Sequence, residues 1–201
     1  LDLATGYWSL LGDKDKAVVA FGKALPEVND KAQLLEIAGY AAQEVGAPDL
    51  AKQFYAKAEE KMSAAPERLK LAEAVIKDTG DKGYALEVYS RAAESLTQPN
   101  DLMSVAADVV DKLGDKAKSG EIYRKAFSAM SDLGQYTKLL EAVDQKLADK
   151  DFGREILVSA GTAASGTPEF LDVAKRTLAV LEDKDLAHEF MDKAEEQVTS
   201  V

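Results

Sequence analysis

The chain has 201 residues, of which 46% are hydrophobic and 30% are charged, a composition typical of folded globular proteins rather than disordered ones. A formal net charge of −11 disfavours nucleic acid and anionic membranes as partners, and no apolar run approaches the roughly 20 residues that a membrane helix needs, so we expect no membrane insertion. The absence of cysteine excludes disulfides, thiolate nucleophiles and cysteine metal sites, and it leaves the compartment open between cytoplasm and export.

A 34-residue period organises the whole sequence. Its turn slots fall at positions 12, 46, 80, 114, 148 and 182, and glycine occupies the first four of them. A fixed period of this length indicates a solenoid, in which each repeat buries its apolar face against its neighbours. We therefore predict a single all-α solenoid domain over residues 1–201, built from six two-helix repeats.

The first helix of each repeat carries apolar residues at spacings of three and four, which place them on one stripe. We expect these first helices at about 1–10, 30–44, 66–78, 100–112, 134–146 and 168–180. The second helices are expected at about 14–26, 48–62, 82–96, 116–130, 150–162 and 184–198. No segment shows the alternation of apolar and polar residues that is typical of a strand.

Two columns mark the second helices. The large apolar column consists of Phe21, Tyr55, Tyr89, Tyr123, Leu157 and Met191. The unbroken alanine column that follows it consists of Ala24, Ala58, Ala92, Ala126, Ala160 and Ala194. Because the large residues recur in one structural position, we expect them to pack between neighbouring helices. Tyr84 lies outside this column and is a candidate for the surface.

The turn chemistry agrees with the helix boundaries. Glycine in the turn slot suits the left-handed residue that ends a helix. Aspartates at positions 13, 81, 115, 149 and 183 follow the turn, and we expect each to cap the second helix. Calcium binding is the alternative for these acidic turns, but they lack the spacing of a calcium loop, and capping explains them. In the fifth repeat the glycines at 153, 161 and 166 predict local mobility.

These columns carry a resemblance to a known family. Gly12, Ala17, Phe21 and Ala24 are similar to the second helix of a tetratricopeptide repeat, and the copies that start at positions 46 and 80 match as well. The first helices are more divergent, since leucine or methionine fills the family's usual tryptophan slot in most repeats. The resemblance implies a right-handed superhelix that binds a peptide or protein in a groove, without catalysis.

Candidate catalytic groups are few. His188 is the single histidine, so no Ser/His/Asp triad and no multi-histidine metal site can be built. The segment 161–167 is rich in glycine and threonine but lacks the lysine of a phosphate-binding loop. The adjacent Glu59 and Glu60 are expected on a solvated helix face. We therefore expect no enzymatic activity, no metal site and no cofactor.

The resemblance implies a groove lined by the outward column of the first helices. The candidate residues are Glu36, Tyr40, Lys70, Ser104, Asp108, Lys138, Asp172 and Arg176. The family's lysine and asparagine clamp for a terminal carboxylate is not matched, because this column contains no asparagine. We predict a protein–protein interaction scaffold that presents a mixed-charge surface to a peptide or protein partner.

A second function follows from the two ends. A solenoid needs terminal helices with a polar outer face, and neither end of this sequence has one. The candidate end-interface residues are Leu3, Tyr7, Trp8, Leu186, Phe190, Met191 and Val198. The alternative hypothesis is a self-assembling structural protein that stacks head to tail into a homo-oligomer or filament. Further repeats in a longer parent chain would explain the apolar ends equally well.

Overall fold

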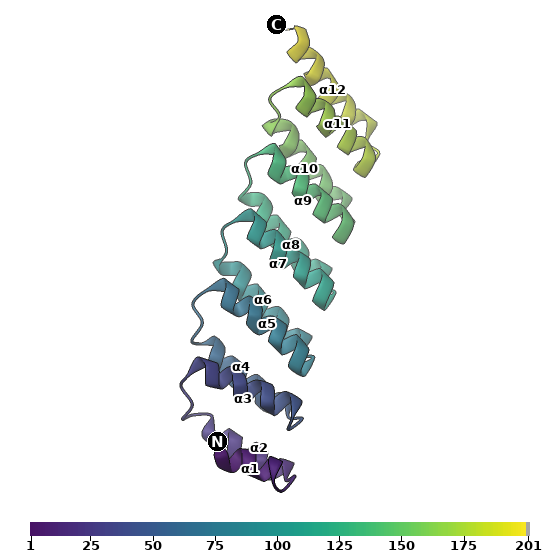
Figure 1. Ribbon diagram of the computed structural model, residues 1–201. Coiled ribbons are helices and arrows are strands. Elements are labelled where there is room, and N and C mark those ends of the chain that lie inside the picture. The colour runs from purple at the N-terminus through teal and green to yellow at the C-terminus, as the bar shows by residue number, and fades with distance from the viewer. Residues whose placement is uncertain (200–201) are drawn as a thin grey trace. The chain divides into compact units, whose positions relative to one another are not determined.

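The computed structural model describes residues 1–199, in which the elements are helices and no strand occurs (Figure 1). The first helices of the repeats are α1 (Asp2–Ser9), α3 (Lys31–Gln43), α5 (Ala65–Thr79), α7 (Pro99–Asp108), α9 (Leu133–Lys146) and α11 (Thr167–Leu181). The second helices are α2 (Lys14–Ala24), α4 (Pro48–Glu59), α6 (Lys82–Ser95), α8 (Lys116–Ser128), α10 (Lys150–Ala163) and α12 (Lys184–Thr199). All twelve predicted helices are therefore confirmed.

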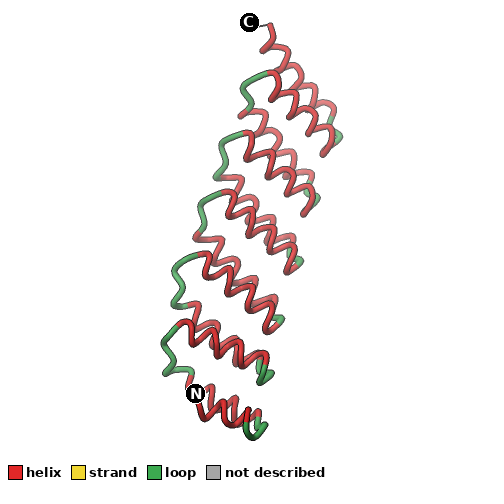
Figure 2. Tube along the Cα trace, in the orientation of Figure 1, coloured by secondary structure: helices red, strands yellow, loops and turns green. Residues whose placement is uncertain are grey.

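The chain gathers into two compact units, Leu1–Ser95 and Leu96–Val201. Within each unit, antiparallel helical pairs stack in chain order, and a first helix packs on the first helix of the next pair, as α3 does on α5 and α7 on α9. The turns inside the pairs lie at one edge of each unit and the links between pairs at the other (Figure 2). This confirms the all-α helical-repeat fold. The single domain over residues 1–201 stays a prediction.

Alanine columns let the two helices of a pair approach closely. Ala38 on α3 and Ala51 on α4 are fully buried, as are their equivalents Ala72 and Ala85 in the third repeat. Where serine replaces alanine, the buried hydroxyl needs a partner, and Ser119 donates to the carbonyl oxygen of Ala106 at 2.8 Å. Shortly after this carbonyl, α7 departs from the predicted helix and continues as a π-helical segment, η1 (Val109–Leu113). A side chain that bonds a helical carbonyl is a recognised cause of such a distortion.

The six turn residues all adopt the left-handed conformation that glycine favours. Their φ angles are 62° at Gly12, 66° at Gly46, 69° at Gly80, 80° at Gly114, 56° at Ala148 and 59° at Glu182. The last two turns therefore keep the geometry of the first four without glycine, which costs each of them about 1–2 kcal/mol of steric strain.

The predicted aspartate caps are confirmed. Asp13 accepts a hydrogen bond from the backbone N–H of Lys16 at 3.0 Å, and Asp183 accepts one from Leu186 at 3.0 Å. The aspartates at 81, 115 and 149 accept equivalent bonds at 2.9, 2.9 and 3.0 Å. The bond from Leu186 and the neighbouring Arg154 hold the pKa of the Asp183 carboxyl below its usual value.

Gly161 has a packing role that the sequence did not indicate. A Cβ atom at this position of α10 would lie 2.1 Å from Cε1 of Phe190, so the ring of Phe190 occupies the space that a side chain would fill. Phe190 is accordingly buried. The glycine thus makes room for the aromatic ring of the next repeat, and its helix cost is offset by that contact.

The tyrosines of the large apolar column differ in how their hydroxyl groups are satisfied. The Tyr55 hydroxyl donates to a carboxylate oxygen of Asp78. The Tyr123 hydroxyl is buried without a hydrogen-bond partner among the described residues. Burial, with the negative charge of Asp111, raises the pKa of Tyr123 to about 12. Burial, followed by the bond to Asp78, raises the pKa of Tyr55 as well.

We expect Ala148→Gly and Glu182→Gly each to stabilise the protein by about 0.5–1 kcal/mol, because glycine removes the left-handed strain and the added chain entropy only partly offsets this. Both side chains are exposed, so no packing is lost. Urea denaturation measures the change. Gly80→Ala is the matched control: it has free space around it but a φ of 69°, and it should be destabilising. A stability loss in the two glycine variants would contradict the strain argument.

We expect Tyr123→Phe to stabilise the protein by about 1 kcal/mol at neutral pH, because it removes a buried hydroxyl that has no partner. Tyr55→Phe, the matched comparison, should cost about 1 kcal/mol because it removes a hydrogen bond. Thermal unfolding distinguishes the two signs. Equal losses in both variants would show that the Tyr123 hydroxyl is satisfied in solution.

The same tyrosine predicts a pH dependence. With an unfolded pKa of 10.0 and a folded pKa of about 12, the unfolded state releases its proton first, so stability is fully present below pH 10 and falls as the pH rises towards 12. Tyr123→Phe should reduce this alkaline loss, measured as the unfolding midpoint across that pH range.

Candidate protein-binding face

Two grooves follow each other along the first helices of the N-terminal unit. The first groove, about 330 Å³, lies between α1 and α3 and is lined by Glu36 and Tyr40 with Phe21 of α2. The second groove, about 320 Å³, lies between α3 and α5 and is lined by Lys70 with Tyr55 of α4. Phe21 and Tyr55 occupy the same position in successive repeats and are both buried, so each groove ends on the same aromatic column. The repeat thus produces a repeated groove.

The first groove contains a pair of aromatic rings. The rings of Phe21 and Tyr40 lie 5.9 Å apart at 55°, within the range of favourable aromatic pairs. Glu36 is exposed, and Leu1 and Thr5 at the start of the chain also line the groove. An apolar side chain that enters this groove would find an aromatic surface and a carboxylate beside it.

Paired polar groups line the second groove. Lys31 forms a salt bridge with Glu67 across it, which lowers the pKa of the Glu67 carboxyl. Asp78 accepts hydrogen bonds from the Tyr55 hydroxyl and, at 2.5 Å, from Gln43. Lys70 is exposed and forms no ion pair with any described residue. A partner's acidic group could therefore pair with Lys70 without breaking an existing contact.

The remaining five groove candidates belong to the C-terminal unit. Ser104 and Lys138 are exposed, whereas Asp108 is bound to Lys112 at 3.1 Å. Arg176 donates to Asp172 on its own helix and to Glu141 on α9, both at 2.8 Å. These bonds raise the pKa of the guanidinium, the Asp172 bond first.

The eight candidates thus divide into two groups. Glu36, Tyr40 and Lys70 line the two grooves of one unit, while the other five lie on first helices of the second unit. Asp172 and Arg176 act within the repeat stack, because their charges are already paired. Among these five candidates, Lys138 is the cation that resembles Lys70 in its exposure.

Sequence reasoning missed one buried polar cluster. Glu59 is buried, and its carboxylate accepts bonds from Arg91 at 2.7 and 2.9 Å and from the Tyr84 hydroxyl at 3.1 Å. The expected solvated face of Glu59 and the surface position of Tyr84 are therefore wrong. Both expectations failed because α6 of the next repeat covers the end of α4. The spacing of 32 residues between Glu59 and Arg91 is close to the period of the repeat, and it was the feature of the sequence that could have indicated this contact between successive repeats.

The end-interface candidates also divide. Leu3 and Val198 are exposed, Met191 is half-exposed, and Tyr7 and Trp8 are partly covered. Leu186 and Phe190 are buried, so these two cannot form an exposed end surface. The reason is the packing of α12: its buried side faces α10 and α11, and Phe190 fills the space over Gly161.

Comparison of the sequence with protein-family models and with curated proteins finds no match. The described helices include none with the length and apolarity required to cross a membrane. Among residues 1–199, His, Asp and Glu side chains do not gather in groups of three that could hold a metal ion. A function is therefore inferred from the geometry of the grooves and of the end faces.

We expect Glu59→Gln to destabilise the protein by about 1–2 kcal/mol, since a charged acceptor of two residues is lost, while solvent screening of the half-exposed Arg91 moderates the effect. Glu60→Gln is the matched control, because Glu60 is adjacent in sequence and exposed, and it should change stability by less than about 0.5 kcal/mol. Urea denaturation provides the measurement. Equal changes in stability for Glu59→Gln and Glu60→Gln would show that Glu59 is exposed to solvent and not buried.

Proposed function

We propose that the protein is a non-enzymatic scaffold of the tetratricopeptide-like kind, which binds a peptide or protein partner along its first helices. The two consecutive grooves of the N-terminal unit are the observation that carries this proposal. They recur at the repeat spacing, and each ends on a buried aromatic residue, Phe21 or Tyr55. An extended chain that follows the helices could place one apolar side chain in each groove.

The charges at the grooves suggest the chemistry of the partner. Glu36 at the first groove favours a basic group, and Lys70 at the second favours an acidic one. The partner we propose is therefore a mixed-charge segment with two apolar anchors. Such anchors supply most of the binding energy of an interface, while charges at the rim set orientation and association rate.

The absence of catalysis belongs to the same proposal. The sequence has one histidine and no cysteine, and its glycine-rich segment 161–167 has no lysine. Apart from Lys70, the charged groups that line the second groove are bonded to one another or to Tyr55, as in the salt bridge between Lys31 and Glu67. Paired groups of this kind suit recognition rather than proton transfer.

Selection from a library of short random peptides tests the proposal, followed by titration of the selected peptides. We expect selected peptides to carry an acidic residue beside an apolar one, and Lys70→Glu to weaken their binding by about 1 kcal/mol in a salt-dependent manner. Lys82→Glu is the matched control, because Lys82 is an exposed lysine of the same unit on a second helix, α6.

Lys138→Glu extends the test to the C-terminal unit. A loss of affinity in this variant alone would place the binding face there, and losses in both variants would indicate that the partner contacts both units. Unchanged binding in Lys70→Glu and Lys138→Glu, or an equal loss in Lys82→Glu, would contradict binding along the first helices.

A further inference from the structure

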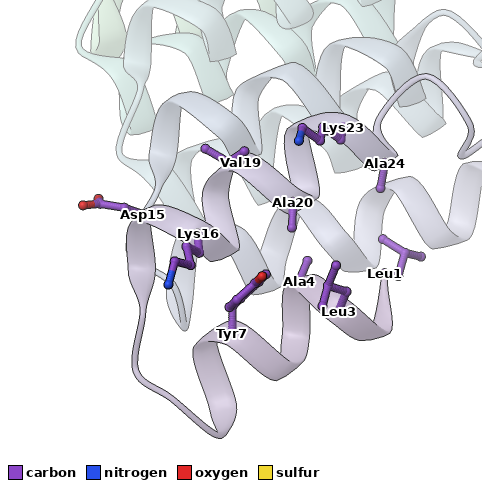
Figure 3. Close-up of a pocket in the computed structure, with 10 residues that line it drawn as sticks. All are labelled: Leu1, Leu3, Ala4, Tyr7, Asp15, Lys16, Val19, Ala20, Lys23 and Ala24. Atoms are coloured by element: carbon purple, nitrogen blue, oxygen red, sulfur yellow. The ribbon is translucent and has the colours of Figure 1, made fainter.

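The outer faces of the first and the last helical pair each carry an open apolar hollow. The hollow on α1 and α2, about 500 Å³, is lined by side chains that include Leu3, Tyr7, Lys16 and Lys23 (Figure 3). The hollow on α11 and α12, about 470 Å³, is lined by side chains that include Leu171, Leu178, Lys184 and Met191. Each hollow belongs to one compact unit. The hollow on α1 and α2 shares Leu1 with the first groove, whereas the hollow on α11 and α12 shares no residue with either groove.

Each hollow includes positions whose equivalents inside the stack are buried. Leu3 is 67% exposed, whereas Ile37, at the same position of the second repeat, is buried. Met191 is 46% exposed, whereas Leu157, at the same position of the fifth repeat, is fully buried. The first pair therefore shows the surface that packs on a preceding pair, and the last pair shows the surface that packs on a following one.

The contacts within each unit indicate which residues would meet if a second copy continued the stack. In such an arrangement the first repeat of the second copy takes the place of a seventh repeat, and every contact between neighbouring repeats has an equivalent. Those equivalents can be read residue by residue from contacts that the structure shows.

The first equivalent contact exchanges a polar pair for an apolar one. Inside the N-terminal unit, Tyr55 of one repeat donates to Asp78 of the next. The corresponding positions at the ends are Met191 on the last pair and Leu10 at the end of α1, which is 83% exposed. At the ends, the apolar Met191 and Leu10 take the places of the polar Tyr55 and Asp78. An apolar side chain would therefore meet an apolar side chain where the interior contact is a hydrogen bond.

The second equivalent contact preserves charge complementarity. Glu59 is bonded to Arg91 of the next repeat. The corresponding positions are Glu195 on the last pair and Lys23 in the hollow of the first pair. Opposite charges are thus retained in the orientation that the interior interface uses.

The third equivalent contact involves the turn between the helices of a pair. Lys14 donates to the carbonyl oxygen of Gly46 in the next repeat at 2.6 Å. The corresponding positions are Lys184 in the hollow of the last pair and Gly12 in the first turn. The donor and the left-handed turn that presents its acceptor are both retained.

We propose that the last helical pair of one copy docks on the first helical pair of a second copy, in the register that joins successive repeats inside each unit. Met191 would pack on Leu10, and Glu195 would pair with Lys23. The two faces differ, so the contact is heterologous, and it leads to an open filament or a ring rather than a two-fold dimer.

Sedimentation velocity and light scattering across a concentration series test the docking. We expect the wild-type mass to rise with concentration, and Leu10→Lys or Met191→Lys each to remain at the 21.6 kDa of one chain, because each buries a charge in an apolar contact. Each variant retains one intact face. An equimolar mixture should therefore form a heterodimer of twice the single-chain mass and grow no further.

Val158→Lys is the matched control, because Val158 is 47% exposed on α10, away from both ends, and should leave association unchanged. Circular dichroism confirms that the variants keep their helical content. Lys23→Glu and Glu195→Lys should each weaken association about two- to fivefold, and the double variant should restore it.

Three results would overturn the proposal. Wild type that stays monomeric up to about 1 mM would show that the hollows do not bind a second copy. Association that is blocked by Met191→Lys but not by Leu10→Lys would indicate a two-fold contact between like ends. A mixture of the two lysine variants that remains monomeric would exclude the head-to-tail register.

Discussion

The close approach of two helices across alanine columns is the constraint on which the rest of the structure depends. Ala38 and Ala51 are fully buried in the second repeat, and their equivalents are buried in the third. In the fifth repeat the larger Leu140 takes the place of Ala38 and is buried, and it faces Gly153, which takes the place of Ala51. The position tolerates serine at 119 only because its hydroxyl finds the carbonyl oxygen of Ala106. Small size, rather than hydrophobicity alone, sets the geometry of the repeat.

Once the pairs are fixed, polar contacts between repeats hold the register. Glu59 and Arg91 are joined over 32 residues, and Lys14 reaches the carbonyl oxygen of Gly46 over the same separation. The exposed members of such pairs contribute little stability individually. They matter because each requires a defined offset between neighbouring helices. The same offsets define the register that we propose for docking between the last helical pair of one copy and the first helical pair of another.

The grooves of the N-terminal unit arise from the repeat itself. Phe21 and Tyr55 are buried in the core, and each also lines one of the two grooves. The large apolar column therefore contributes both to the stability of the core and to the proposed binding grooves. The side chains that differ between grooves, Glu36 and Lys70, lie at the rims, where a change of charge does not disturb packing.

The sequence by itself determined the period, the twelve helices, the turn slots and the aspartate caps. These features repeat every 34 residues and depend on local chemistry: periodic apolar positions, left-handed turns and orphan backbone amides. The columns of large residues and alanines also identified the core, except at Met191, which is 46% exposed, and at Ala24, which is only partly buried.

Only the tertiary structure decided which polar or small residues each neighbour covers. Glu59 on α4 and Tyr84 on α6 are buried, and the hydrogen bond between them joins two successive repeats. Gly161 looks like a weak point in α10 until the ring of Phe190 is placed over it. A period predicts the position of a side chain but not the volume or charge of the residue opposite. Packing between repeats depends on the residues at two facing positions. A single column of the repeat gives the residue at only one of them.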